Sequence, residues 1–300
     1  MQDRSCNADA SDGLRPDLPG GTVNAIIPDM NRTVRSLASG ISMMAVAVTT
    51  IALMSSSPAK AGNAGFGRSR LGMRSSTGLE GARLAKPGDV VILLHGLARS
   101  ASMWTAMESK LASQGLAPLA LDYPSRNKSL EALADSVLNP LLDSLERAGV
   151  PRVHFVTQSM GAILLRTTLA RHGHTNLGGA VMIAPPNQGS EVATLTTRLG
   201  YGKWMLGPNL ERLSNTNRGF FDSLGPARIP TGVIAGDRTW NFLNSLVIPG
   251  DDDGKVAVAS THLLGEADWL LVHQNHTFLH SCDQSLEQTV RFLTNGKFGS

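Results

Sequence analysis

The stretch Val153-His154-Phe155-Val156-Thr157-Gln158-Ser159-Met160-Gly161 decides how this chain is expected to fold. Residues 153–157 are expected to form a strand, as are residues 90–94, whose continuous apolarity is typical of a strand buried on both faces of a parallel sheet. Residues 160–171 have the length and composition of a helix, and Gly173 is a stop signal. Ser159 is therefore expected on a sharp strand-to-helix turn, with its hydroxyl at the carboxyl edge of the sheet.

The alternation of strand and helix continues on both sides of this turn. Strands are expected at 90–94, 117–122, 153–157, 179–184, 231–235 and 269–272. Helices are expected at 102–113, 129–148 with an interruption at Pro140, 160–171 and 282–293. Short connections imply right-handed crossovers, so the predicted class is α/β, with a mostly parallel sheet of about six strands and helices on both faces.

One long departure from the alternation lies between the fourth and fifth expected strands. Residues 187–230 are too long for a simple loop, and they carry helical patterns at 191–199 and 210–224. We expect this segment to be a small, cap-like helical insertion over one end of the sheet.

The composition limits the classes of protein that fit. The chain has 300 residues, of which 42% are hydrophobic and 17% charged, so it can form a large core and is not disordered as a whole. Only one stretch is apolar enough to enter a bilayer, which excludes a polytopic membrane protein. A net charge of +3 without basic-aromatic patches gives no reason to expect a nucleic-acid partner. Two cysteines, Cys6 and Cys282, do not form a disulfide framework.

The N-terminal region has the residue pattern of a targeting segment. Residues 30–35 are short and positive, 37–54 are uncharged and mostly apolar, and 59–61 are Ala-Lys-Ala. This order is typical of a secretory signal peptide at 30–61, cleaved after Ala61, so we expect export to the periplasm or the exterior. The alternatives are an uncleaved membrane anchor through 37–54 and a buried core helix.

The segments around this signal complete the predicted organisation. Residues 1–29 are polar and without periodicity, and we interpret them as an unstructured, over-extended gene start before translation from Met30. Residues 62–87 are rich in Gly, Ser and Arg and are expected to be a flexible lead-in. A single domain is then expected over 88–300, with the insertion at 187–230.

The loop after the first strand is expected to meet Ser159. In sheets of this type, one backbone N–H after the first strand and the N–H after the nucleophile together form an oxyanion hole. These positions are Leu97, in His95-Gly96-Leu97, and Met160. The alternative is that Ser159 is only the N-cap of an ordinary helix.

A nucleophilic serine needs a base and an acid later in the chain. Of His273, His276 and His280, His276 best fits a position just past the last strand and before the closing helix. The acid candidates are the run Asp251-Asp252-Asp253 and Asp237, which follows the fifth strand. The alternative for the run is a solvated turn or a chance cation site.

Several ordered motifs together resemble a known family. They are His95-Gly96-Leu97, Asp122-Tyr123-Pro124, Thr157-Gln158-Ser159-Met160-Gly161, Ala184-Pro185-Pro186-Asn187-Gln188-Gly189-Ser190, Asp253-Gly254-Lys255-Val256 and Asn275-His276-Thr277. Over about 88–298 the chain resembles α/β-hydrolases of the bacterial lipase and GPI-inositol-deacylase-like branch. The resemblance implies the α/β-hydrolase fold and selects Asp253 as the acid. The departures are Thr157 for the usual glycine and Gln158 for the commoner histidine.

The resemblance also implies a function. The implied function is that of a serine hydrolase, esterase- or lipase-like, which cleaves carboxylic esters. The reaction would use Ser159, His276 and Asp253 without a metal or an organic cofactor. The expected partner is a small-molecule or lipid ester, with transient contact to a lipid surface in the second case; the oligomeric state is left open. Weak candidates for an apolar substrate pocket, or alternatively for a satellite core, are Trp204, Met205, Leu206, Phe220 and Phe221.

Two other classes of function use the same residues. An acyltransferase, a thioesterase or an amidase would share the Ser-Asp-His set and differ only in substrate. A non-catalytic hydrolase-like protein would use the pocket for binding alone, although three intact candidate residues argue against it.

Overall fold

The computed structural model of the chain describes residues 73–74, 89–199, 206–239 and 242–299. The predicted gene start, the predicted signal peptide at 30–61 and the predicted lead-in at 62–87, apart from 73–74, lie outside these ranges. The fold below therefore concerns the predicted hydrolase-like domain.

A seven-stranded sheet forms the centre of the fold, in the order β1-β3-β2-β4-β5-β6-β7. All neighbours are parallel except β1, which pairs antiparallel with β3. The strands are β1 (Met73–Arg74), β2 (Val90–Leu94), β3 (Ala117–Leu121), β4 (Val153–Gln158), β5 (Leu177–Ile183), β6 (Thr231–Gly236) and β7 (Asp268–Val272). The six predicted strands are all present, and the two-residue β1 is an addition from the lead-in.

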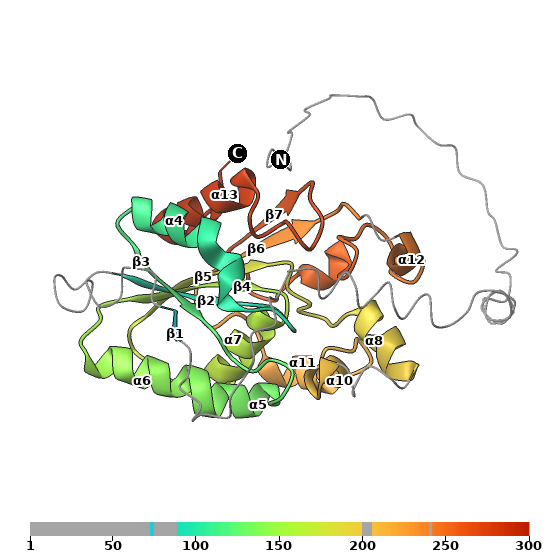
Figure 1. Ribbon diagram of the computed structural model, residues 1–300, viewed down its shortest axis with the longest axis horizontal. Helices are drawn as coiled ribbons and strands as arrows, with labels where there is room; N and C mark the ends of the chain where they lie inside the picture. The colour runs from blue at the N-terminus through green and yellow to red at the C-terminus, as the bar shows by residue number, and fades with distance from the viewer. Residues whose placement is uncertain (1–72, 75–88, 200–205, 240–241, 300) are drawn as a thin grey trace, which may run out of the picture. The chain divides into compact units, whose positions relative to one another are not determined.

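Burial on both faces explains why β2 and β3 consist of apolar residues without alternation. Every residue of β2, β3 and β4 is buried, because helices cover both faces of the sheet. In Figure 1, α4 (Thr105–Ser113) and α13 (Asp283–Asn295) lie over one face, and α5 (Leu130–Leu133), α6 (Asn139–Arg147) and α7 (Met160–Arg171) over the other. The predicted α/β class with two covered faces is confirmed. No helix within the described ranges is both long and apolar enough to cross a bilayer.

The helix expected at 129–148 accommodates Pro140 without a break. Its backbone widens into a π-helical turn, Ala134–Leu138, and Pro140 falls in the first turn of α6. Proline has no N–H to donate to the preceding turn, and the wider π-helical turn directly before α6 accommodates this missing hydrogen bond. The predicted interruption is thus a change of helical pitch.

The insertion is helical, but the expected helix at 210–224 is wrong as one continuous element. The structure has α8 (Glu191–Arg198), α10 (Asn209–Arg212) and α11 (Arg218–Leu224). The chain between α10 and α11 is held at the start of α8, because Ser190 N–H donates to Leu213 O at 2.8 Å and Ser214 forms a bridge with Ser190. These bonds replace the helical hydrogen bonds that a continuous helix would make.

A buried arginine fastens the insertion to the helix that follows Ser159. Arg166 on α7 donates from Nη1 to Asn187 O at 3.0 Å, and from Nη2 to Phe221 O at 3.3 Å and Gly225 O at 3.0 Å. Burial lowers the pKa of Arg166 to about 10, which leaves the guanidinium charged at neutral pH. Both ends of the insertion are therefore held by one side chain.

Candidate active site

The site lies where the order of the strands reverses. Strands β2 and β4 are neighbours at the centre of the sheet. The chain leaves the carboxyl end of β2 toward β3 on one side, and the carboxyl end of β4 toward β5 on the other side. Such a switch point is where open α/β sheets bind their ligands. The two loops touch there, because a Cβ on Gly96 would lie 3.3 Å from the Cβ of Ser159.

Ser159 occupies a strained backbone conformation between β4 and α7. Its φ is 53° and its ψ is −122°, a region that non-glycine residues rarely adopt and that costs about 1–3 kcal/mol. The turn is held by the bond from Ser159 N–H to Ile183 O at 2.9 Å and by the bond from Ala162 N–H to Ser159 O at 3.0 Å. The side chain is half-buried between buried neighbours, as the predicted strand-to-helix turn requires.

Thr157 lies two residues before Ser159 and Gly161 two residues after it, and only Thr157 has space for a side chain. A Cβ on Gly161 would clash with Leu94 O and would lie 2.9 Å from His95 O, both backbone atoms that cannot swing away. Thr157 is fully buried, and its Oγ1 has no hydrogen-bond partner among the described residues. Close approach of helix and strand thus demands glycine after the serine but accepts threonine before it.

The two amides expected to form an oxyanion hole are unused by the fold. Within the described part of the chain, neither Leu97 N–H nor Met160 N–H donates a hydrogen bond. Their loops are in contact through Gly96 and Ser159. Two free donors on touching loops are the arrangement that binds a developing oxyanion.

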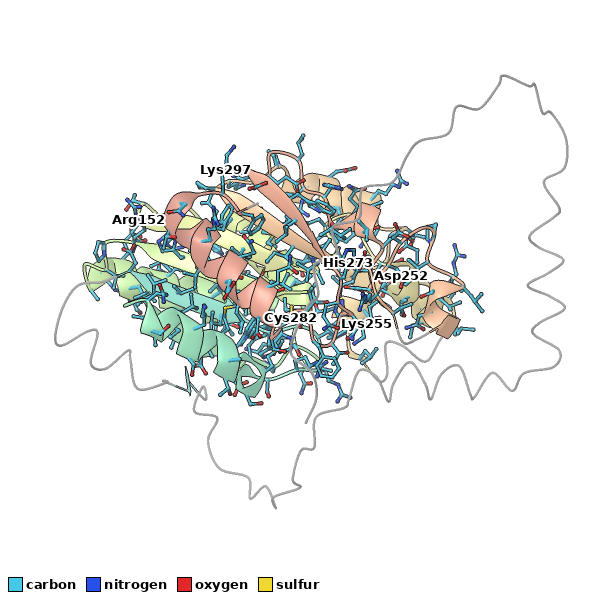
Figure 2. The ribbon with its side chains drawn as sticks, turned by 90° about the horizontal axis from the view of Figure 1, so that it is seen from above. Arg152, Asp252, Lys255, His273, Cys282 and Lys297 are labelled. Atoms are coloured by element: carbon cyan, nitrogen blue, oxygen red, sulfur yellow. The ribbon has the colours of Figure 1, made fainter. Side chains whose placement is uncertain are left out.

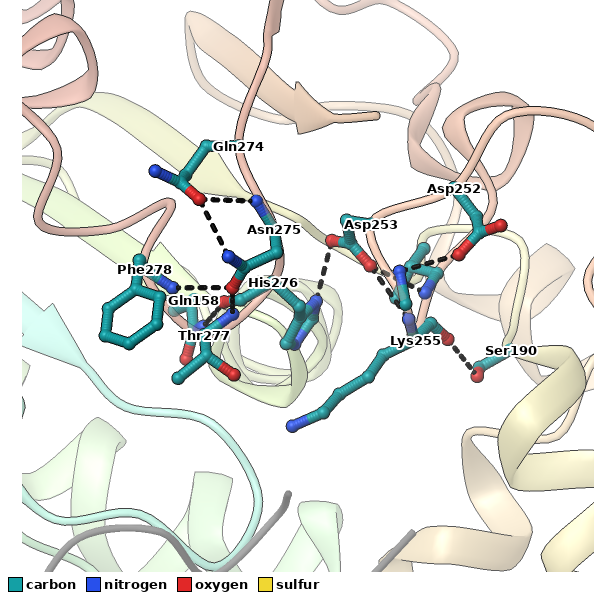
Figure 3. Close-up of polar contacts among 12 residues, drawn as sticks. Gln158, Ser190, Asp252, Asp253, Lys255, Gln274, Asn275, His276, Thr277 and Phe278 are labelled. Atoms are coloured by element: carbon teal, nitrogen blue, oxygen red, sulfur yellow. Dashed lines mark hydrogen bonds and ion pairs between the residues drawn. The ribbon is translucent and has the colours of Figure 1, made fainter. Parts of the chain in front are cut away.

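Asp253 and His276 form a buried pair. The Oδ2 of Asp253 lies 2.7 Å from His276 Nδ1, and Asp253 Oδ1 accepts the N–H groups of Lys255 at 3.0 Å and Val256 at 2.9 Å (Figure 3). The backbone is also joined, by His276 N–H donating to Asp253 O at 2.9 Å. The carboxylate is therefore fixed by the turn and presents one oxygen to the imidazole.

The other acid candidates are engaged elsewhere. Asp252 Oδ1 accepts Gly254 N–H at 2.6 Å and Ser245 Oγ–H at 3.0 Å, and burial raises its pKa. Asp237 pairs with His273 at 2.7 Å, in a contact whose histidine is half exposed. Asp253 is the candidate that contacts His276.

The three histidines after β7 have different environments. His280 is buried, its Nε2 donates to Met103 O at 3.1 Å, and burial lowers its pKa to about 4. Burial also lowers the pKa of His276, against the opposing effect of Asp253. A buried His276 that is neutral at pH 7 suits a general base.

Among the described residues, neither reactive atom of the expected serine–histidine contact makes a hydrogen bond. The two atoms are Ser159 Oγ and His276 Nε2. Such contacts are often long in the absence of substrate and shorten when it binds.

Gln158 also helps to position the site. The sequence marked it only as a departure from the family pattern. It is buried, and its Nε2 donates to His276 O at 2.9 Å (Figure 3). The residue beside Ser159 thereby holds the backbone of the His276 loop against the end of β4. Its adjacency to the serine is the only signal in the sequence for this contact.

Two cations near His276 were also missed. Lys255 follows Gly254 in the quoted Asp-Gly-Lys-Val motif, and Arg99 ends a turn closed by its N–H donating to Gly96 O at 3.3 Å. Both charges are close enough to lower the pKa of His276, after the larger effect of burial. A lysine and an arginine at loop positions carry no pattern that marks them from sequence.

His95 supports the loop rather than facing a ligand. Its ring is fully buried and stacks on Tyr123, with ring centroids 4.0 Å apart and an angle of 6° between planes. The Tyr123 hydroxyl donates to His95 O. The histidine side chain therefore fixes the backbone that carries Leu97.

The predicted pocket residues are only partly described. Trp204 and Met205 lie outside the described ranges, and Leu206, Phe220 and Phe221 are buried. Phe220 and Phe221 make an edge contact on α11, which packs against α7, as a satellite core would. Their role in a substrate pocket stays a prediction. In the described part of the chain, no group of three or more His, Cys, Asp or Glu side chains is placed to hold a metal ion.

Comparison with known proteins agrees with this geometry. A family model described as the alpha/beta hydrolase family matches residues 91–290. A search of the curated proteins found no match.

Solved structures with the same fold include enzymes that act on esters. The mature form of lipase BlEst2 from Bacillus licheniformis is 18% identical with a TM-score of 0.59, covering 70% of this chain and 93% of the lipase. A metagenomic carboxyl esterase is 16% identical with a TM-score of 0.53, covering 69% of this chain and 75% of the esterase. Lipase B from Aspergillus fumigatus is 16% identical with a TM-score of 0.51, covering 71% of this chain and 54% of the lipase. At these identities the likeness shows the fold alone.

Proposed function

This chain belongs to the alpha/beta hydrolase family, and on that premise we propose that it is a serine hydrolase of carboxylic esters. The observation that carries the proposal is the buried hydrogen bond between Asp253 and His276, at the sheet edge that also carries the strained turn of Ser159. A structural turn has no need of a buried acid–base pair beside a half-buried serine.

The first half of the proposed reaction forms an acyl-enzyme. Ser159 Oγ attacks the ester carbonyl carbon while His276 Nε2 takes the hydroxyl proton, and the N–H groups of Leu97 and Met160 bind the oxyanion. The imidazolium then gives that proton to the leaving alcohol as the carbon–oxygen bond breaks. Asp253 holds the ring and stabilises its positive charge.

The second half returns the enzyme to its starting state. Water gives a proton to His276 and attacks the acyl carbon, and the proton passes to Ser159 Oγ as the carboxylic acid leaves. Each amide donor of the oxyanion hole is typically worth about 3 kcal/mol in the transition state. The cycle balances with ester and water as the only reactants.

The choice of ester as substrate class is supported by the solved neighbours. Two of the three described above are titled lipases and one a carboxyl esterase, and all share this fold. The acyltransferase, thioesterase and amidase alternatives use the same steps with a different acceptor or leaving group.

The function is tested by kinetics on a panel of acyl compounds. Nitrophenyl esters of increasing chain length are compared with a thioester and an amide, using wild type, Ser159→Ala and His276→Ala. We expect ester turnover that falls by several orders of magnitude in both variants without loss of folding. Faster turnover of the thioester or the amide than of every ester would contradict the proposed substrate class.

We also propose that the protein is exported, on the strength of the charge, apolar and small-residue order at 30–61. The mature chain is then expected to begin at Gly62. N-terminal sequencing of protein recovered from the periplasm or the medium tests this, and a chain that retains residues 37–54 in the membrane would favour the anchor.

A further inference from the structure

Ser190 is the last residue of the motif at 184–190, which has no part in the reaction proposed above. It is the N-cap of α8, where its Oγ accepts Ala193 N–H at 3.3 Å. Its own hydroxyl proton goes elsewhere, because Ser190 Oγ–H donates to Lys255 O at 2.9 Å (Figure 3). This bond joins the insertion to residues 251–258, which carry Asp253 and are called the acid turn below. Ser190 therefore does more than begin a helix.

The carbonyl that Ser190 binds belongs to a peptide unit whose other end holds Asp253. Lys255 C=O and Val256 N–H are the two ends of one planar peptide group. Val256 N–H donates to Asp253 Oδ1 at 2.9 Å, and Asp253 Oδ2 lies 2.7 Å from His276 Nδ1. Because the group is planar, a bond that fixes the direction of its carbonyl also fixes the direction of its N–H. A continuous run of hydrogen bonds thus leads from Ser190 to the imidazole of His276.

The backbone of Ser190 is itself firmly held. Its N–H donates to Leu213 O at 2.8 Å, and its carbonyl oxygen accepts both Thr194 N–H and Thr194 Oγ1–H at 3.0 Å. The residue is buried. A hydroxyl on a fixed, buried backbone holds the group that it binds in one direction, as the supporting residues of a catalytic site must do.

The insertion also makes an apolar contact with the acid turn. A small buried cluster joins α8 to this part of the chain, and its members are Val192, Ile248 and Ala257. Figure 2 shows Asp252 and Lys255 of the acid turn toward the other end of the sheet from Arg152, the residue before β4. Apolar packing has no preferred direction, so it holds the two segments together without orienting the peptide. The orientation comes from the hydroxyl of Ser190.

We propose that Ser190 is a positioning residue for the ester hydrolysis proposed above, which fixes Asp253, and through it His276, by way of the Lys255–Val256 peptide. The inference rests on the proposed function and adds a residue to its acid–base part. The imidazole must lie within a narrow range of positions when it takes the serine proton, so loosening it slows the chemical step. Substrate binding does not depend on that position. Loss of the hydroxyl should therefore lower kcat and leave KM nearly unchanged.

Two variants of nearly the same shape isolate the hydroxyl. Ser190→Thr keeps an O–H group, and Ser190→Val has a methyl group in its place. With a neutral nitrophenyl ester, we expect Ser190→Val and Ser190→Ala to lower kcat about three- to tenfold at nearly constant KM. Ser190→Thr should retain most of the wild-type kcat. An equal loss of kcat in the threonine and valine variants would overturn the proposal.

Two control variants remove the other contributions of Ser190. Val192→Ala weakens the apolar contact between α8 and the acid turn. Ser129→Ala removes an N-cap contact from another helix, where Ser129 Oγ accepts Ala132 N–H at 3.1 Å. We expect both to lower the unfolding midpoint and to keep kcat within about twofold of wild type. A loss of kcat in Val192→Ala as large as that in Ser190→Ala would assign the effect to general packing and would overturn the proposal.

A double-mutant cycle tests whether Ser190 acts through Asp253. The measured quantity is the rate of covalent labelling by a fluorophosphonate, which needs a single reaction of the serine and so remains measurable in slow variants. Ser190→Ala should slow labelling about three- to tenfold in wild type, but less than about twofold in Asp253→Asn. Equal slowing in both backgrounds would overturn the proposal, because a structural effect of Ser190 does not depend on the acid. The cycle needs neither the threonine nor the valine variant.

Failure of this inference is distinct from failure of the proposed function. If wild type cleaves esters and is labelled on Ser159, while Ser190→Ala and Ser190→Val keep the wild-type kcat, Ser190 is not a positioning residue and the serine hydrolase stands. If wild type cleaves no ester and Ser159 is not labelled, the proposed function fails and the role of Ser190 fails with it.

Discussion

Asp253 Oδ2 lies 2.7 Å from His276 Nδ1, and both side chains are buried. The same separation joins Asp237 to His273, where half of the histidine side chain is exposed. Distance therefore does not distinguish the two pairs. Burial and the two backbone N–H groups on Asp253 Oδ1 do, because they fix one carboxylate against one imidazole in a medium where the charge interaction is strong.

Replacing each acid by its amide tests this distinction. Asp253→Asn should lower kcat by about three to four orders of magnitude, because an amide no longer holds the imidazole in the required tautomer. Asp237→Asn, the matched control on the exposed pair, should leave kcat within about twofold. A crippling Asp237→Asn beside a mild Asp253→Asn would reverse the assignment of the acid.

Adding a methyl group at Gly161 should damage the turn of Ser159. The new Cβ would be forced against the backbone oxygens of Leu94 and His95, so we expect Gly161→Ala to cost about 1–3 kcal/mol in unfolding free energy and to lower kcat. Gly173→Ala is the control, since a Cβ there meets nothing within 4 Å. Denaturant unfolding and ester kinetics are measured on both, and equal stability would contradict the close approach.

Loss of the buried arginine should loosen the insertion. Arg166→Met leaves Asn187 O, Phe221 O and Gly225 O without their donor, and we expect a loss of about 2–4 kcal/mol in unfolding free energy. The control is Arg171→Met on the same helix, whose pair with Asp135 lies on the surface and is screened by solvent, so its loss should change the unfolding free energy little. Similar unfolding midpoints for the two variants would argue against this fastening.

The pH profile should report a histidine of lowered pKa. Burial lowers the pKa of His276 below the ordinary histidine value of 6.5, and only neutral imidazole accepts the serine proton. The kcat/KM for a neutral ester should therefore rise with pH and reach half of its plateau below pH 6.5. A midpoint clearly above 6.5 would mean that Asp253 outweighs burial.

The sequence predicted the parts of this molecule that depend on local pattern. Residues 90–94 form β2, as their continuous apolarity predicts for a strand buried on both faces, and the predicted strand at 153–157 lies within β4. The alpha/beta hydrolase family is confirmed by its model, whereas the lipase and inositol-deacylase branch stays a prediction.

Long-range contacts that no family motif marks were not predicted. The break between α10 and α11 depends on Ser190 and Leu213, and the support of His276 by Gln158 spans more than a hundred residues. Neither contact leaves a periodic signal. The same holds for Arg99 and Lys255, whose meaning comes from proximity to His276 in the folded chain.

The most direct measurement of the proposed nucleophile is covalent labelling by a fluorophosphonate, read out by mass spectrometry of the labelled peptide. The serine oxygen attacks phosphorus and displaces fluoride, so the adduct identifies the activated hydroxyl. We expect one adduct on Ser159 in wild type, none in Ser159→Ala, and much slower labelling in His276→Ala. Absence of an adduct in wild type, or an adduct on another residue with ester turnover intact in Ser159→Ala, would contradict the proposed serine hydrolase.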